Sequence, residues 1–118
     1  MAISTLTHGE HLVVTLREEI SHLHGSVLRD HIVNALQPQV KAVFLDLRQV
    51  SFINSVAIGD LVGTKMTLED RGVATFLVDP SPAVSRVLVC AYLDSIFEIL
   101  KELPKTLADC LNRTESAA

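Results

Sequence analysis

Tryptophan is absent from the sequence, and its 118 residues include only one tyrosine and four phenylalanines. Any hydrophobic core must therefore be built from aliphatic side chains. Hydrophobic residues make up 48% of the chain, which is typical of a globular protein and argues against disorder. Cys90 and Cys110 are too few for a disulfide framework, and we interpret them as ordinary thiols of a reducing compartment.

The sequence also lacks a basic excess, a long apolar run and a secretion signal. The net charge of −4 argues against a nucleic-acid partner, because nucleic-acid binders usually present a basic face. No stretch approaches the ~20 apolar residues that a membrane-spanning helix needs. The first residues lack the basic start and apolar run of a signal peptide. We therefore expect a one-domain cytoplasmic protein without direct membrane insertion.

Short apolar runs alternate along the chain with longer amphipathic segments. The runs at 42–47 and 73–78 are nearly continuous, which predicts strands covered on both faces. The two N-terminal runs predict a hairpin through a turn at His8-Gly9. Strands are expected at 2–6, 11–16, 42–47, 73–78 and, as a short edge strand, 95–99; helices are expected from Ser21 or Ser26 to Leu36, at 55–70, from Pro82 onward and at 103–111. This alternation predicts an α/β fold: a mixed β-sheet of about four to five strands packed with about four α-helices.

Glycine and proline have two roles in the later helices: two glycines lie inside a helix, and Gly72 and Pro82 mark helix boundaries. Gly59 and Gly63 each cost roughly 1 kcal/mol in a helix interior relative to alanine. We interpret them as places where the helix backbone approaches a neighbour closely. Gly72 is expected to end that helix as a left-handed cap. For the next helix, Ser81 is expected as the N-cap and Pro82 as the first helical residue.

Motifs of enzymes and cofactor sites are missing. There is no G-x-S-x-G elbow, no phosphate-binding loop and no dinucleotide fingerprint. His22 and His24 would point to different sides of a strand or a helix, without cysteines or an acidic cluster beside them, so no metal site is predicted. Asp46 closes a strand, where it would either orient Ser55 or accept a hydrogen bond from a loop amide. We therefore expect no catalytic residue, no cofactor and no enzymatic activity.

Ser55 lies where the chain passes from a buried strand into the second expected helix. Its position alone favours an N-cap, an interaction worth ~1 kcal/mol. The alternative is a phosphorylation switch. A phosphate carries about −1.5 to −2 charges, which the positive end of a helix dipole would tolerate. A partner docked over the same place would not tolerate that charge, so phosphorylation would change binding and leave the fold intact.

Several segments resemble the STAS domain family, and more specifically the anti-sigma factor antagonists of bacteria. The family pattern is a strand ending L-D-L, followed by F-[IM]-D-S-[ST]-G-[LI]-G and a helix; residues 43–47, 50–59 and 61–63 (VFLDL, VSFINSVAIG, LVG) are similar to it. Residues 81–88 (SPAVSRVL) are similar to the family's S-P-x-V-x-R-x-[LF] helix start, and 93–99 to its next segment.

The resemblance implies a function for the serine. Ser55 matches the serine that a cognate anti-sigma factor, a serine kinase of the GHKL type, phosphorylates. The unphosphorylated antagonist binds that kinase, phosphorylation breaks the complex, and a PP2C-type phosphatase restores it. The implied partner-binding residues are Asn54, Ser55, Val56, Ile58 and Gly59. The resemblance also implies a single STAS domain over 1–112, followed by a frayed tail at 113–118.

The sequence departs from the family pattern at three places. Asn54 stands where the family usually has Asp, Val56-Ala57 replaces [ST]-G, and Tyr92 stands where many relatives have Gly. These departures leave a second function open. In it, the chain is a scaffold subunit of a membrane transporter of the lipid ABC type, or of a stress-sensing complex, without a phosphorylation switch.

Overall fold

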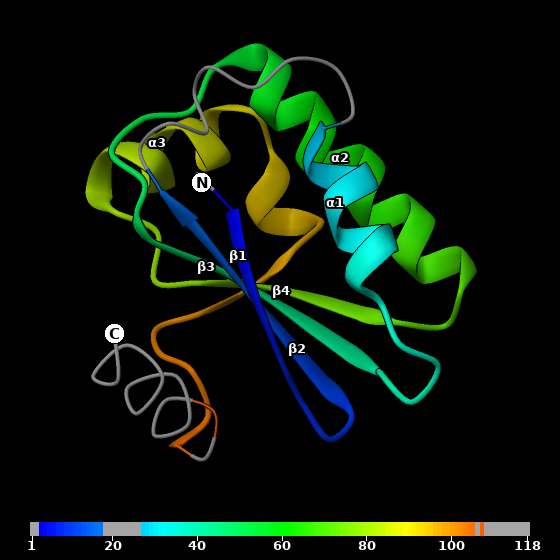
Figure 1. The fold of residues 1–118 in the computed structure, drawn as a ribbon. Coiled ribbons are helices and arrows are strands. Elements are labelled where there is room, and N and C mark those ends of the chain that lie inside the picture. Colours follow the sequence, from blue (N-terminus) through cyan, green and yellow to red (C-terminus); the bar gives the residue numbers. More distant parts are fainter. Residues whose placement is uncertain (1–2, 18–26, 106, 108–118) are drawn as a thin grey trace.

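A five-stranded mixed sheet forms the centre of the computed structural model, which describes residues 3–17, 27–105 and 107. The spatial order of the strands follows the chain: β1 (Ile3–His8), β2 (His11–Arg17), β3 (Ala42–Gln49), β4 (Ala74–Val78) and β5 (Glu98–Leu100) (Figure 1). β1 and β2 are antiparallel, whereas β2 to β5 are parallel neighbours. The predicted α/β class, the hairpin and the mixed sheet are confirmed.

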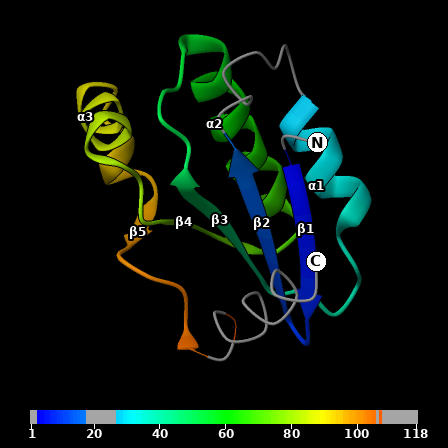
Figure 2. The ribbon, with the colours of Figure 1, turned by 60° about the vertical axis from the view of Figure 1, so that its left-hand side comes forward.

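All three α-helices of the described residues pack on the same face of the sheet. They are α1 (Val27–Ala35), α2 (Ser55–Asp70) and α3 (Pro82–Cys90), and a short 3-10 helix, η2 (Leu93–Ser95), follows α3. Figure 2 shows α1 and α2 side by side, with α3 on the other side of the connection that leads into α2. The shared core contains Leu45 of β3, Ile32 of α1, Leu61 of α2 and Leu88 of α3.

The opposite face of the sheet has a smaller apolar cluster. Phe44 of β3 stacks on the partly buried Phe76 of β4, with ring centroids 5.0 Å apart. Leu103 and Leu107, which follow the last strand, are buried in the same cluster. Because both faces of β3 are covered, its run from Ala42 to Leu47 is buried throughout, as the continuous apolar pattern predicted.

Two element predictions need correction. The fifth strand is Glu98–Leu100, not 95–99, because a helical turn extends past η2: the Phe97 amide donates to the Leu93 carbonyl at 2.9 Å. Four α-helices were expected, and three lie within the described residues. The helix expected at 103–111 lies largely outside those residues, as do Ser21, Ser26, His22, His24, Cys110 and the expected tail. Among the described residues, no helix is both long enough and apolar enough to cross a membrane.

The interpretation of Gly59 and Gly63 in α2 as places of close backbone approach is wrong. A Cβ on Gly59 would meet no atom within 4 Å, and one on Gly63 would be in ordinary contact with Arg29 at 3.6 Å. Neither glycine is therefore needed for close helix packing. Gly72, in contrast, has φ +74° and ends α2 as predicted. Its amide donates to Glu69 and the next amide to Leu68, each at 2.9 Å, which is the Schellman pattern.

Tyr92 follows α3 in the left-handed conformation (φ 61°, ψ 21°), which costs a residue with a Cβ roughly 1–2 kcal/mol. Its side chain is 78% exposed and contributes little to the core. We expect Tyr92→Gly to raise the free energy of unfolding by about 1 kcal/mol in urea denaturation, because glycine removes that cost. Tyr92→Ala is the control, since alanine keeps the Cβ; equal stability of the two variants would contradict the argument.

Candidate functional site

Two connections meet at the carboxyl-end edge of the parallel strands. One runs from β3 to α2 and contains Val50 to Asn54; the other runs from β4 to α3 and contains Ser81. β3 and β4 are hydrogen-bonded neighbours, so their carboxyl ends lie next to each other. A hydrogen bond joins the two connections: the Ser81 hydroxyl donates to the Val50 carbonyl at 3.3 Å. In open α/β sheets this edge is where functional groups gather.

Asn54, and not Ser55, is the N-cap of α2. Its backbone is extended (φ −104°, ψ 178°), and its side-chain Oδ1 accepts a hydrogen bond from the Ala57 amide at 2.9 Å. Its carbonyl accepts the first intrahelical bond, from Ile58, at 3.0 Å. Ser55 is therefore the first helical residue. The prediction of a Ser55 N-cap is wrong by one position, because asparagine caps as well as serine does.

The Ser55 side chain is exposed, and within the described part of the chain its hydroxyl makes no hydrogen bond. It lies at the helix N-terminus, where the first backbone N–H groups have no intrahelical acceptor. The positive end of the helix dipole is at the same place. Ser55 is thus exposed, and its hydroxyl takes no part in the hydrogen bonds between the described residues.

The predicted partner-binding residues differ in accessibility. Val56 is 43% exposed, and Gly59, one turn after Ser55, is exposed as well. Asn54 is half-buried because it caps the helix, and Ile58 packs partly against the core. Ser55, Val56 and Gly59 therefore form the outward surface, while Asn54 and Ile58 chiefly hold the helix in place.

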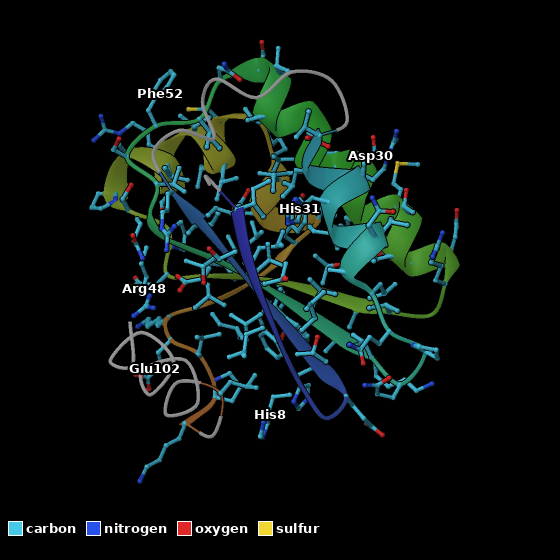
Figure 3. All side chains as sticks on the ribbon, in the orientation of Figure 1. His8, Asp30, His31, Arg48, Phe52 and Glu102 are labelled. Carbon is cyan, nitrogen blue, oxygen red and sulfur yellow. The ribbon has the colours of Figure 1, made fainter. Side chains whose placement is uncertain are left out.

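Sequence reasoning missed Phe52 as a member of this surface. Phe52 is 57% exposed, although it lies between Val50 and Ile53, which are both buried. Figure 3 shows Phe52 pointing outward from the connection that leads into α2. An aromatic side chain is costly to leave in water, so its exposure makes Phe52 a candidate member of the surface that contains Ser55. Phe52, Ser55, Val56 and Gly59 are called the switch surface below.

The charge of this region is low. Arg48 is the one charged residue between Leu47 and Gly59, and the sequence places no carboxylate there. Asp46, which was considered as a group that orients Ser55, is instead buried and bound to Arg48. It accepts from the Arg48 amide at 3.1 Å and from the guanidinium at 2.8 Å. These contacts agree with the second interpretation of Asp46, a carboxylate that accepts a hydrogen bond from a loop amide.

A second carboxylate was missed altogether. Asp60 lies on the buried side of α2 and accepts hydrogen bonds from the amides of Leu28, at 2.8 Å, and Arg29, at 3.2 Å. Both amides belong to the first turn of α1, so a side chain of α2 caps α1. This pair of bonds fixes the half of α2 that carries the switch surface. The capping partner is 32 residues away in sequence, which no local pattern reveals.

Other chemistry is not found among the described residues. No group of three or more histidine, cysteine, aspartate or glutamate side chains is arranged to hold a metal ion there. Cys90 is an exposed free thiol at the end of α3. Besides that thiol, the feature of the described geometry that invites a chemical use is the exposed Ser55 at the start of α2.

The cap assignment predicts different costs for two neighbouring substitutions. Asn54→Ala is expected to lower the free energy of unfolding by about 1 kcal/mol, because the Ala57 amide loses its acceptor. Ser55→Ala is expected to change it by less than about 0.5 kcal/mol, as for other exposed positions. Urea denaturation of both variants measures this. Asn54→Asp is the control that keeps an acceptor, and a larger loss in Ser55→Ala than in Asn54→Ala would restore Ser55 as the cap.

Comparison with known proteins places this arrangement in a family. The model of the STAS domain matches residues 2–110. Among solved structures, a candidate anti-sigma factor antagonist of Thermotoga maritima is 20% identical over 91% of this chain and 92% of that one, with a TM-score of 0.72. A chain of the stressosome, described as a signal integration and transduction hub, is 19% identical over 94% and 98%, with a TM-score of 0.74.

The anti-sigma factor antagonist SpoIIAA in its unphosphorylated form is 22% identical over 96% of this chain and 97% of that one, with a TM-score of 0.67. At these identities the solved structures establish the fold. The family itself is established by the match to the STAS family model, which covers nearly the whole length of this chain. This chain belongs to the STAS domain family.

Proposed function

We propose that the chain is a cytoplasmic anti-sigma factor antagonist, a partner-switching regulator controlled at Ser55. It binds an anti-sigma factor that is also a serine kinase of the GHKL type while Ser55 is unphosphorylated. Phosphorylation of Ser55 releases it, and a PP2C-type phosphatase removes the phosphate. The observation that carries the proposal is the exposed Ser55, whose hydroxyl makes no hydrogen bond among the described residues and which has the exposed Phe52 and Val56 close to it in sequence.

The apolar part of the switch surface supports protein binding. Phe52 and Val56, which precede and follow Ser55 in the sequence, are 57% and 43% exposed. Exposed apolar groups that lie together mark contact surfaces, and aromatic residues dominate the energy of such contacts. Because this segment has no carboxylate of its own, an apolar or acidic partner surface would suit it.

Phosphorylation would change this surface strongly. The Ser55 oxygen attacks the γ-phosphorus of ATP, the bond to ADP breaks, and the serine proton leaves with a base of the kinase. The product carries about −1.5 to −2 charges at pH 7. The first turn of α2 accommodates that charge through its free N–H groups and its dipole. A partner pressed against the same place would instead have to desolvate it.

The fold would survive this change for a simple reason. The hydrogen bond that starts α2 belongs to Asn54, so a phosphate on Ser55 would displace no hydrogen bond between the described residues. Among the similar structures, SpoIIAA in its phosphorylated form retains the fold, with a TM-score of 0.62 to this chain. The switch would therefore act on binding alone.

A second candidate function is a scaffold subunit of a stress-sensing complex without a phosphorylation switch. The specific observation in its favour is the likeness to the stressosome chain over 94% of this sequence. The two candidates differ in the consequence of charge at Ser55. Only the first requires binding to depend on it.

The switch is tested by substituting Ser55 and measuring affinity for the kinase partner by calorimetry. Ser55→Asp is expected to weaken binding at least about tenfold, equivalent to roughly 1.4 kcal/mol. Ser55→Ala is expected to retain binding and lose phosphorylation, which mass spectrometry would locate. Circular dichroism is expected to be unchanged in both. If Ser55→Asp binds like the wild type and Ser55 stays unmodified with kinase and ATP, the switch is wrong and the scaffold function gains support.

Gly59 offers a test of where the partner docks. Gly59→Ala is expected to stabilise the fold by up to about 1 kcal/mol, because the new methyl group meets nothing and the helix becomes stiffer. The larger Gly59→Gln, also a good helix former, is expected to weaken partner binding by blocking the surface one turn below Ser55. Thermal unfolding and calorimetry separate the two effects. Met66→Gln, at an exposed position further along α2, is the control, and equal binding by both glutamine variants would place the partner elsewhere.

A further inference from the structure

We propose that Ser81 is a positioning residue for Ser55: its hydroxyl holds the connection from β3 to α2 against the start of α3, so that the switch surface is presented in one geometry. The inference rests on the proposed function of Ser55 and adds to it the residue that keeps the phosphate acceptor in place. Ser81 has no contact with Ser55 among the described interactions and acts through the backbone between Val50 and Asn54.

The Ser81 hydroxyl serves two elements at once. It accepts a hydrogen bond from the Val84 amide at 3.3 Å, which makes Ser81 the N-cap of α3, as the sequence predicted. It also donates to the Val50 carbonyl at 3.3 Å, across 31 residues of sequence. A serine hydroxyl has one proton to donate and lone pairs to accept, so both bonds can exist together. A residue needed only as a cap would use the acceptor alone.

The surroundings of Ser81 fix the direction of its hydroxyl. Pro80 and Pro82 flank it, and proline restricts both its own backbone and that of the preceding residue. Ser81 accordingly has an extended backbone, with ψ 161°. The Ser85 hydroxyl donates to the Pro80 carbonyl at 3.3 Å, which braces the same turn from α3. The donor to Val50 is thus carried by a stiff segment.

In the described part of the chain, two further hydrogen bonds support the connection that Ser81 holds: the Val50 amide donates to the Leu47 carbonyl at 3.1 Å, and Asn54 caps α2. Val50 and Ile53 are buried in the core, but Ser51 and Phe52 between them are exposed. The Ser55 hydroxyl has no hydrogen bond of its own in the described part of the chain. Its place therefore depends on the backbone that leads to it, from the Val50 carbonyl to the Asn54 cap.

The presentation of Ser55 matters to a kinase because phosphoryl transfer needs the attacking oxygen within about 3–3.5 Å of phosphorus. A misplacement of about 1 Å can cost on the order of 100-fold in rate. Loosening the connection would leave the serine chemically intact and accessible but less often in the reactive position. The consequence would be a slower modification with an unchanged fold.

Ser81→Asp and Ser81→Thr separate the hydrogen bond to the Val50 carbonyl from the cap of α3. Ser81→Asp keeps an N-cap acceptor as good as serine, but an ionised carboxylate has no proton to donate to Val50. Ser81→Thr keeps both the donor and the acceptor. Ser81→Ala loses both and shows their combined cost. Hydrogen exchange followed by mass spectrometry on the full chain reports the backbone from Val50 to Ala57, with α1 as an internal reference.

We expect exchange across this connection to quicken at least about threefold in Ser81→Asp, with exchange in α1 unchanged. Ser81→Thr is expected to restore the wild-type rate. With the kinase partner, we expect kcat/KM for Ser55 phosphorylation to fall about tenfold in Ser81→Asp and to recover in Ser81→Thr. A merely structural cap would leave Ser81→Asp like the wild type in both measurements, and that result would overturn the inference.

The two proposals fail separately. If wild-type Ser55 is phosphorylated and Ser81→Asp is phosphorylated equally fast, the role of Ser81 is wrong and the switch stands. If the wild type is not phosphorylated at all, the switch is wrong. The exchange measurement then still decides whether Ser81 holds the connection, because it needs no partner.

Discussion

The hydrogen bond between the Asn54 side chain and the Ala57 amide determines where α2 begins, and the character of the site depends on it. With Asn54 as the cap, Ser55 becomes the first helical residue, and its hydroxyl makes no hydrogen bond to another described residue. If Ser55 itself were the cap, a phosphate on it would have to break the interaction that starts the helix. The helix cap is Asn54, and the proposed phosphate acceptor is the next residue, Ser55. Because these roles fall on two residues, a phosphate on Ser55 would be compatible with a stable helix.

The sheet topology supplies the second constraint. Because β3 and β4 are parallel neighbours, the connections that follow them emerge at the same edge, and one serine hydroxyl can reach from one connection to the other. On the buried side of α2, Asp60 joins this helix to the first turn of α1. The N-terminal half of α2 is thus held from two directions by side chains. The outward surface consists of Ser55, Val56 and Gly59 of this helix and Phe52 of the connection before it.

The sequence predicts this fold well where the signal is local. The continuous apolar runs of β3 and β4, the limits of α2 and the Ser81-Pro82 start of α3 all follow from periodicity and capping preferences. The start of α2 is uncertain by one residue, because Asn54 and Ser55 are both good caps and only the backbone angles decide between them. Asp60 is not predictable, since its partners lie 32 and 31 residues earlier. Gly59 is misinterpreted because a glycine cannot reveal from sequence whether its missing side chain faces a neighbour or solvent.

The departures from the family pattern gain a physical meaning from these contacts. Asparagine at position 54 keeps the side-chain oxygen that caps α2, so the replacement of aspartate leaves the helix start unchanged. It removes one negative charge from the place where the phosphate would lie, and like charges at one helix terminus repel. A phosphate on Ser55 would therefore be the sole negative charge from this segment at the positive end of α2. The substitution that departs from the family thus keeps the cap of α2, and under the proposed function it would favour the phosphorylated state.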